Sequence, residues 1–327
     1  MTAGGGAPLT PTPLGEHLRR RGGPHAADVD AIVGGLAEAG VTIARELGRA
    51  ALVGRLGTTG MTNVQGEAVK KLDLWANDVV VEALGATGRV ATLVSEEMED
   101  PLRRPVRDGA PWVVCFDPVD GSSNLDVNGV VGTIFSIRPG DAPSQPGTAQ
   151  VAAGYVMYGP STVLVLATGD GVDAFTLDVT SGTFLHSLAK IRIPPRGHVY
   201  SVNEGNAAKW EPGMRRYVEH LRAADVATGR PYSARYVGSL VADFHRTLLE
   251  GGIYLYPGEA GRTEGKLRLQ YEAAPMALVV EQAGGRASTG RERIMAITPA
   301  SHHQRVPLLV GSPDDVTLAE DFLTGRR

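Results

Sequence analysis

A short apolar run that ends in acids and small polar residues sets the strongest constraint on how this chain can fold. Residues 112–116, Trp-Val-Val-Cys-Phe, lie between Pro111 and Pro118, and a β-rich run this short predicts a buried strand rather than a helix. Asp117 and Asp120 follow at its carboxyl end, where a turn through Pro118 can direct both side chains to one side. Two carboxylates this close together require a cation or a proton.

The residues after these acids favour a phosphate ligand. Residues 121–124, Gly-Ser-Ser-Asn, offer consecutive backbone N–H groups and small side chains, so a phosphate can approach the backbone closely. Hard oxygen ligands favour Mg²⁺ or Mn²⁺ over zinc. The alternative is a turn that only closes a strand, which is the usual role of Asp, Gly, Ser and Asn clusters. A simple turn does not need so many acids beside an apolar strand, so we favour a metal and phosphate site.

A second apolar run, residues 90–94, also ends in acids. Glu96 and Glu97 follow this predicted strand directly, whereas Glu99 and Asp100 lie further out, as surface charges do. If the two strands are neighbours, both acidic clusters enter one cleft. Taken alone, the second cluster could equally be a solvated acidic loop.

The predicted elements indicate an α/β (α+β layered) protein with an arm and two domains. Residues 1–26 are rich in Gly, Pro and Thr and predict a flexible arm, apart from a possible helical turn at 15–21. The first domain, 27–195, starts with two helices and continues with strands. The last three of these, over 152–177, are joined by tight turns, which predicts an antiparallel meander. The composition changes around 193–197. The second domain, 196–327, alternates strands and helices, as in a helix-covered sheet.

The element boundaries follow from hydrophobic periodicity and turn residues. In the first domain the helices are expected over about 27–51 and 67–84, and the strands over 90–94, 112–116, 133–138, 152–158, 162–168 and 172–177. In the second domain the strands are expected over 199–202, 252–256 and 308–310, and the helices over 214–223, 239–250 and 272–282.

Composition excludes several classes of protein. The 327 residues are 43% hydrophobic and carry a net charge of −4 with no long basic stripe, which argues against a nucleic-acid partner. No apolar stretch is long enough to span a bilayer and no apolar leader follows Met1, so we expect a cytoplasmic protein with no membrane partner. The single cysteine, Cys115, cannot form an intrachain disulfide and is expected to be buried in its strand.

Several collinear motifs resemble the Mg²⁺-dependent, lithium-sensitive sugar and inositol phosphatases, and specifically class I fructose-1,6-bisphosphatase. The resemblance covers roughly residues 27–312. Its motifs are Asp-Pro-Val-Asp-Gly-Ser-Ser-Asn at 117–124, Asn-Val-Gln-Gly-Glu at 63–67, Lys-Lys-Leu-Asp at 70–73, Val-Gly-Thr-Ile-Phe at 131–135, Tyr-Ser-Val-Asn-Glu-Gly at 200–205, Ala-Arg-Tyr-Val-Gly-Ser-Leu-Val-Ala-Asp at 234–243, Tyr-Leu-Tyr-Pro at 254–257 and Gly-Lys-Leu-Arg-Leu-Gln-Tyr-Glu at 265–272. Motifs in this order are far more specific than one acidic turn.

The resemblance implies the sugar-phosphatase fold, with α-β-α-β-α layers and the active site between two domains. It implies hydrolysis of D-fructose 1,6-bisphosphate to D-fructose 6-phosphate and phosphate, in gluconeogenesis or the Calvin cycle. Two to three Mg²⁺ ions per subunit are implied, with Mn²⁺ possible. The implied metal ligands are Glu67, Glu96, Asp117, the carbonyl of Val119, Asp120 and Glu272. The implied pair that orients and deprotonates the attacking water is Glu97 with Asp73.

The resemblance also implies how a sugar bisphosphate is held. The scissile phosphate and the sugar are assigned to Asp120, Gly121, Ser122 and Ser123, and the distal phosphate to Asn203, Arg235, Tyr236, Tyr256 and Lys266, with Arg268 nearby. In the family the arginine that matches Arg235 reaches in from a neighbouring subunit, which implies a homotetramer. Taken one at a time, these tyrosines could be ordinary sheet aromatics and the cations solvated surface charges.

Three other functions remain open on the sequence. A bifunctional fructose-1,6-/sedoheptulose-1,7-bisphosphatase would use the same residues, because both substrates have a reacting and a distal phosphate. An inositol-type monophosphatase would not need the distal group of Arg235, Tyr256 and Lys266. A non-catalytic phosphosugar-binding protein would not need acids at every metal position.

Overall fold

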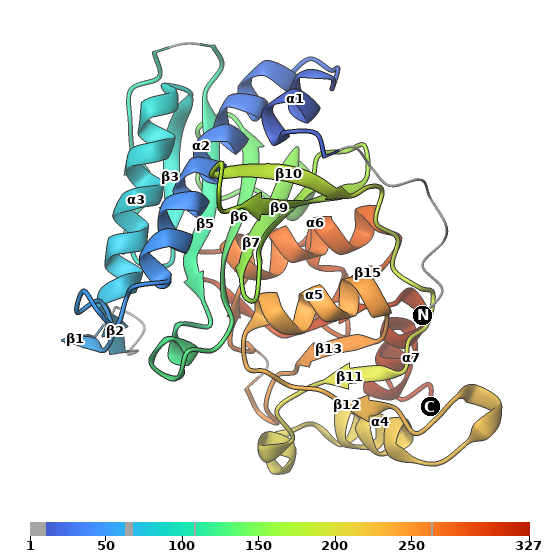
Figure 1. Cartoon of the computed structure of the whole chain (residues 1–327). Helices are drawn as coiled ribbons and strands as arrows, with labels where there is room; N and C mark the ends of the chain where they lie inside the picture. The colour runs from blue at the N-terminus through green and yellow to red at the C-terminus, as the bar shows by residue number, and fades with distance from the viewer. Residues whose placement is uncertain (1–10, 63–67, 108, 263) are drawn as a thin grey trace.

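Two β-sheets and three groups of helices stack as alternating layers in the computed structural model (Figure 1), which describes residues 11–62, 68–107, 109–262 and 264–327. Helices lie on the outer face of each sheet, and further helices lie between the two sheets. The layered α-β-α-β-α arrangement expected from the resemblance is therefore confirmed.

The larger sheet has eight strands in the order β10-β9-β8-β7-β6-β5-β3-β4. Its strands are β3 (Val90–Ser95), β4 (Leu102–Arg103), β5 (Trp112–Asp120), β6 (Val131–Pro139), β7 (Ala152–Tyr158), β8 (Thr162–Ala167), β9 (Val172–Asp178) and β10 (Thr183–Leu188). Strands β5 to β10 are antiparallel neighbours. This confirms the meander predicted for β7 to β9 and extends it to β5, β6 and β10. Strand β3 runs parallel to β5, so the residues that follow both strands lie at the same edge.

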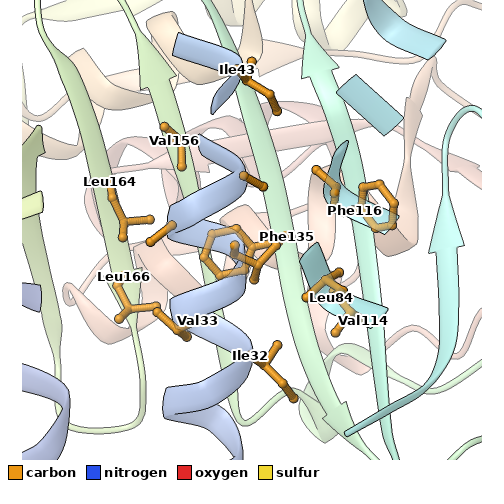
Figure 2. Close-up of a cluster of buried hydrophobic side chains, with 14 of the residues drawn as sticks. Ile32, Val33, Ile43, Leu84, Val114, Phe116, Phe135, Val156, Leu164 and Leu166 are labelled. Carbon is orange, nitrogen blue, oxygen red and sulfur yellow. The ribbon is translucent and has the colours of Figure 1, made fainter. Parts of the chain in front are cut away.

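One face of the larger sheet packs on α2 (Ala26–Leu47) and α3 (Lys71–Thr87). Figure 2 shows Ile32, Val33 and Ile43 of α2 beside apolar side chains of the strands. Side chains of a strand alternate between its two faces, so Phe135 of β6 enters this core while its neighbour Ile134 enters the core on the other face. Full burial of one such side chain contributes about 1.5–3 kcal/mol.

The chain between residues 11 and 20 is packed against this first domain, which corrects the expected arm over 1–26 for the described residues. Helix α1 (Leu14–Arg19) buries Leu14 and Leu18, which are 5% and 2% exposed. The carbonyl of Thr12 accepts a hydrogen bond from the backbone N–H of His186 in β10 at 2.9 Å. Helix α1 overlaps the possible helical turn expected at 15–21, whereas the packing of this segment on the sheet was not expected from its Gly/Pro/Thr composition.

The smaller sheet has five strands in the order β12-β11-β13-β17-β15. Its strands are β11 (Val199–Ser201), β12 (Ser233–Ala234), β13 (Ile253–Tyr256), β15 (Arg286–Ser288) and β17 (Leu308–Gly311). Helices α5 (Leu240–Glu250) and α6 (Ala274–Gln282) lie between the two sheets, and α4 (Pro212–Arg222) and α7 (Pro313–Leu323) cover the outer face (Figure 1). The sequence pattern missed β10, β15 and α7, and also the two-residue strands β4 and β12.

The remaining elements are short. They are the strands β1 (Thr58–Thr62), β2 (Ala68–Lys70), β14 (Leu267–Arg268) and β16 (Arg305–Val306), five 3-10 turns, and a π-helical turn, η5 (Leu269–Ala273), that leads into α6. Within the described ranges, no helix combines the length and apolar character needed to cross a membrane.

Candidate active site

Asp117 and Asp120 face the same cavity because β5 contains a bulge. Asp117 pairs with Ile134 of β6 and Asp120 pairs with Gly132, so three steps along β5 oppose two along β6. In a regular strand, residues three apart point to opposite faces, and the extra residue of a bulge brings them to one side. The sequence predicted this common direction but assigned it to a turn. The strand in fact continues past Phe116 to Asp120.

The third acid of the cluster, Glu272, comes from the other half of the chain. It lies on the π-helical turn η5, and its Oε2 accepts a hydrogen bond from the backbone N–H of Arg268 at 2.5 Å. Ligand oxygens of Asp117, Asp120 and Glu272 all lie within 4.8 Å of one another, close enough to share a metal ion. An all-oxygen donor set of three carboxylates fits a hard divalent cation.

Burial raises the pKa of each acid in this cluster. Desolvation is the largest cause for Asp117, and the nearby negative charges of Glu96, Asp120 and Glu272 raise its pKa further. Burial and the charge of Glu96 also raise the pKa of Glu272 well above its usual range. The pKa of Asp120 is raised to about 6, less than burial alone would give, because it accepts several hydrogen bonds. A cation in the cluster would remove this repulsion.

The N-terminus of α5 holds Asp120. Its Oδ2 accepts hydrogen bonds from the Ser239 hydroxyl and the Val241 N–H, both at 2.8 Å. Ser239 is also the N-cap of α5, so the positive end of the helix dipole faces this carboxylate. Gly121 has a φ of 75°, and a Cβ there would lie 2.8 Å from the Ser239 Cβ, so only glycine permits this approach. Ser239 was not predicted as a site residue, although a serine before an apolar helix is an N-cap signal.

Asp73 and Glu97 are two further acids in the cavity that holds the cluster. Asp73 is in the first turn of α3, is 5% exposed, and accepts a hydrogen bond from the Lys70 N–H at 3.3 Å. Desolvation raises the pKa of Asp73 to about 7. Glu97 lies two residues after the end of β3 and is half-buried. Both line the same cavity as the metal-type acids, and Lys70, which the sequence analysis did not select, lines it too.

One cavity of about 510 Å³ brings most of the predicted residues together. Its lining includes Asp73, Glu96, Glu97, Asp117, Val119, Asp120, Gly121, Ser122, Ser123, Tyr236, Tyr256, Lys266, Arg268 and Glu272. Ser122 and Ser123 begin the 3-10 helix η1 (Ser122–Val127), directly after the bulged strand.

A second cavity of about 210 Å³ shares Tyr256 and Lys266 with the first and is also lined by Asn203. Arg235 is not among the residues that line either cavity in the described part of the chain. It is exposed, and its Nη1 donates to the carbonyl of Ala234 at 2.9 Å. Glu67 lies outside the described residues.

Arg268 contacts the acid cluster, whereas the resemblance placed it near the distal phosphate. The side chain is 3% exposed, its Nη2 lies 3.7 Å from Glu96 Oε1, and its Nη1 donates to the Lys266 carbonyl at 2.8 Å. Its charge also lowers the pKa of Glu272. The guanidinium therefore offsets the repulsion between carboxylates, a contribution that the motif alone did not reveal.

Comparisons with known proteins point to one family. The family descriptions "Fructose-1-6-bisphosphatase, N-terminal domain" and "Fructose-1-6-bisphosphatase, C-terminal domain" match residues 18–189 and 193–324. The chain is 53% identical over 295 residues to the class 1 fructose-1,6-bisphosphatase of Chlorobium chlorochromatii (strain CaD3), covering 87% of this chain and 89% of that protein. It is 49% identical over 311 residues to the corresponding protein of Chlorobaculum tepidum, covering 92% and 93%.

Solved structures that resemble this chain come from the same family. The holo form of Leishmania major fructose-1,6-bisphosphatase superposes with a TM-score of 0.90 at 39% identity, covering 97% of this chain and 100% of that one. The T-state of the same protein gives a TM-score of 0.85 at 38% identity, covering 96% and 99%.

Proposed function

Because this chain belongs to the class 1 fructose-1,6-bisphosphatase family, we propose that its acid-lined cavity is where fructose 1,6-bisphosphate is hydrolysed to fructose 6-phosphate and phosphate. The observation that carries the proposal is the position of the carboxylate cluster. One cavity is lined by Asp117, Asp120 and Glu272 together with Lys266 and Tyr256. Carboxylates that can bind a metal and side chains that can bind a second phosphate therefore face the same space.

We propose Mg²⁺ as the metal, with two to three ions per subunit. The residues that would hold the ions are Glu96, Asp117, the Val119 carbonyl, Asp120 and Glu272, together with Glu67. When bound, the metal lowers the pKa of a water and offsets negative charge on the phosphoryl and leaving oxygens. The hydrogen bonds from Ser239 and Val241 both go to the Oδ2 of Asp120, and we assign its Oδ1 to the metal.

The attacking water is assigned to Asp73 and Glu97. Asp73 is buried and its Oδ1 has no hydrogen-bond partner in the described chain, so this oxygen can accept from a water. Its pKa of about 7 suits a base that operates near neutral pH. Glu97 supplies the second carboxylate that fixes the orientation of the water. The start of η1, with Ser122 and Ser123, would receive the scissile phosphate through backbone N–H and hydroxyl groups.

The distal phosphate is assigned to Asn203, Tyr236, Tyr256 and Lys266. Lysine neutralises phosphate charge, whereas asparagine and tyrosine orient it through neutral hydrogen bonds. We propose that Arg235 completes this pocket in a second copy of the chain, because it is exposed and is not among the residues that line its own cavities. The corresponding assembly is a cytoplasmic homotetramer, with domains over 27–195 and 196–327.

Phosphate release from the purified protein tests the proposal. Fructose 1,6-bisphosphate, sedoheptulose 1,7-bisphosphate and inositol monophosphate are each supplied with Mg²⁺ and with a chelator. We expect Mg²⁺-dependent release from fructose 1,6-bisphosphate and little from the monophosphate, which has no distal group for Lys266. Equal rates with the bisphosphate and the monophosphate would contradict the distal pocket, and chelator-resistant activity would contradict the metal site.

A further inference from the structure

A buried arginine behind the acid cluster has no acidic partner. Arg138 of β6 is 0% exposed, and its guanidinium donates to Gln270 and Cys115, with no ion pair to a carboxylate among the described residues. Removing a charge from water costs several kcal/mol unless hydrogen bonds compensate. A buried arginine therefore needs strong acceptors, and the acceptors that Arg138 contacts belong to the segments that carry the metal-type acids.

Arg138 contacts both of those segments. Its Nη1 donates to Gln270 Oε1 at 2.8 Å, and its Nη2 donates to the Gln270 carbonyl at 3.3 Å. Its Nη1 also lies 3.0 Å from the Cys115 sulfur. Gln270 is two residues before Glu272 on η5, and Cys115 is two residues before Asp117 on β5. The Arg138 side chain thus links β5 and η5, the segments that carry Asp117 and Glu272.

The π-helical turn explains why the Gln270 carbonyl needs this donor. In a π-helical turn, N–H groups bond to carbonyls five residues earlier, and the N–H of Ala274 bonds to the Leu269 carbonyl in this way. The next residue, Pro275, has no N–H, so the Gln270 carbonyl lacks the partner that would continue the pattern. A buried carbonyl without a donor is costly. The Arg138 guanidinium supplies the missing donor from the neighbouring sheet.

We infer that Arg138 is a positioning residue that holds η5 against β5 and β6, and thereby sets the distance of Glu272 from Asp117 and Asp120. The inference rests on the proposed metal site and deepens it. It extends the site to a residue that neither the resemblance nor the acid pattern selected. Loss of the arginine would leave Asp117 and Asp120 in place but allow Glu272 to shift with its turn.

Arg138→Met tests the inference, because methionine fills much of the volume without donating a hydrogen bond. Mg²⁺ binding is measured without substrate, as the rise in Tm with Mg²⁺ concentration and by calorimetry. Groups that orient metal ligands typically change metal affinity by about 10–100-fold when removed. We expect the Mg²⁺ midpoint of Arg138→Met to rise roughly tenfold, while the KM for fructose 1,6-bisphosphate at saturating Mg²⁺ changes by less than about twofold.

Two further variants keep the test decisive. Gln270→Met removes only the side-chain acceptor and should move the Mg²⁺ midpoint in the same direction by a smaller factor, even if Arg138→Met does not fold. Arg286→Met removes an arginine of β15 that pairs with Glu320 away from the cluster, and should leave the Mg²⁺ midpoint unchanged. In the double variant, the Mg²⁺ midpoint should be close to that of Arg138→Met alone, because both changes remove the same contact.

A Mg²⁺ midpoint within twofold of the wild type in folded Arg138→Met would overturn the inference. So would a loss of Tm that is the same with and without Mg²⁺, because a purely structural role predicts that result. Failure of the proposed function is a separate outcome: the wild-type protein would then release no phosphate from the bisphosphate, whatever the Mg²⁺ titrations of the variants show.

Discussion

The hydroxyl of Ser239 donates a 2.8 Å hydrogen bond to Oδ2 of Asp120, although 119 residues separate them. Ser239 begins α5, a helix that lies between the two sheets, and Asp120 ends the bulged strand of the larger sheet. The contact therefore fixes one acid of the cluster to the second domain. It also explains why the pKa of Asp120 is raised only to about 6 despite burial, because hydrogen bonds to the carboxylate favour its charged form.

Ser239→Ala should weaken both the helix and the metal site. Loss of an N-cap hydroxyl costs about 0.5–2 kcal/mol, which corresponds to a decrease in Tm of roughly 2–4 °C per kcal/mol for a domain of 150–250 residues. The Mg²⁺ midpoint for activity should rise several-fold, because one hydrogen bond that orients Asp120 is lost. Ser239→Thr keeps the hydroxyl and is the matched control. An unchanged Mg²⁺ midpoint in Ser239→Ala would show that the contact only caps the helix.

Asp73→Asn should alter the pH dependence of turnover. The pKa of Asp73 is raised to about 7 by burial, so the carboxylate loses its proton, and becomes able to act as a base, as the pH rises through about 7. We expect the wild-type kcat at saturating Mg²⁺ to fall on the acid side of this value. Asp73→Asn should reduce kcat by about 100-fold and remove that acid limb. Asp78→Asn, on the same helix but exposed, is the control and should keep the wild-type profile.

Thermal stability should depend on pH and on Mg²⁺ together. The pKa values of Asp73, Asp117, Asp120 and Glu272 are all raised in the folded state. At a pH above the pKa values that these acids have in the unfolded chain, the folded protein binds more protons than the unfolded chain does. The stability of the metal-free protein therefore decreases as the pH rises from about 4 through about 7. Mg²⁺ binds the deprotonated acids and offsets this loss. Calorimetry should therefore show a larger Mg²⁺-induced rise in Tm at pH 8 than at pH 6; a rise that is equal or smaller at pH 8 would refute the cluster as the binding site.

Arg235→Ala tests whether the distal pocket is shared between subunits. Loss of a charge-assisted hydrogen bond to phosphate costs roughly 1.5–3 kcal/mol, so the KM for fructose 1,6-bisphosphate should rise by one to two decades while the Mg²⁺ midpoint stays near the wild-type value. Mixing Arg235→Ala subunits with Asp120→Asn subunits should restore part of the activity, because some pockets regain both an intact metal site and a donated arginine. A raised KM with no recovery, despite demonstrated subunit exchange, would place Arg235 in the pocket of its own subunit.

The local sequence predicted the acids and strands well because both depend on short patterns. The strand at residues 112–116 and the acids at its carboxyl end follow from an apolar run bounded by prolines. The parallel pairing of β3 with β5 then brought Glu96 beside Asp117, as expected for neighbouring strands. The bulge could not be predicted, because it depends on how β5 pairs with Gly132 and Ile134 of β6.

Contacts between the two halves of the chain were not predictable from local patterns. Glu272 was predicted as a ligand only through the resemblance, since a lone acid before an apolar helix has no metal signature. The ion pair of Arg268 with Glu96 and the hydrogen bond of Ser239 with Asp120 depend on the packing of the second domain on the first. The π-helical turn before Pro275 was also missed, because the periodicity over 272–282 resembles that of an ordinary helix.

The most direct test of the account is the kcat of Asp120→Asn on fructose 1,6-bisphosphate at saturating Mg²⁺. Asparagine keeps the size of the side chain but removes the negative charge, and its Tm without metal serves as the check that the fold is intact. Removal of one group that stabilises charge in a transition state typically lowers kcat by about 100- to 1,000-fold. The account predicts a loss of at least about 100-fold in a folded protein. A kcat close to that of the wild type would contradict the assignment of Asp117, Asp120 and Glu272 as the metal site.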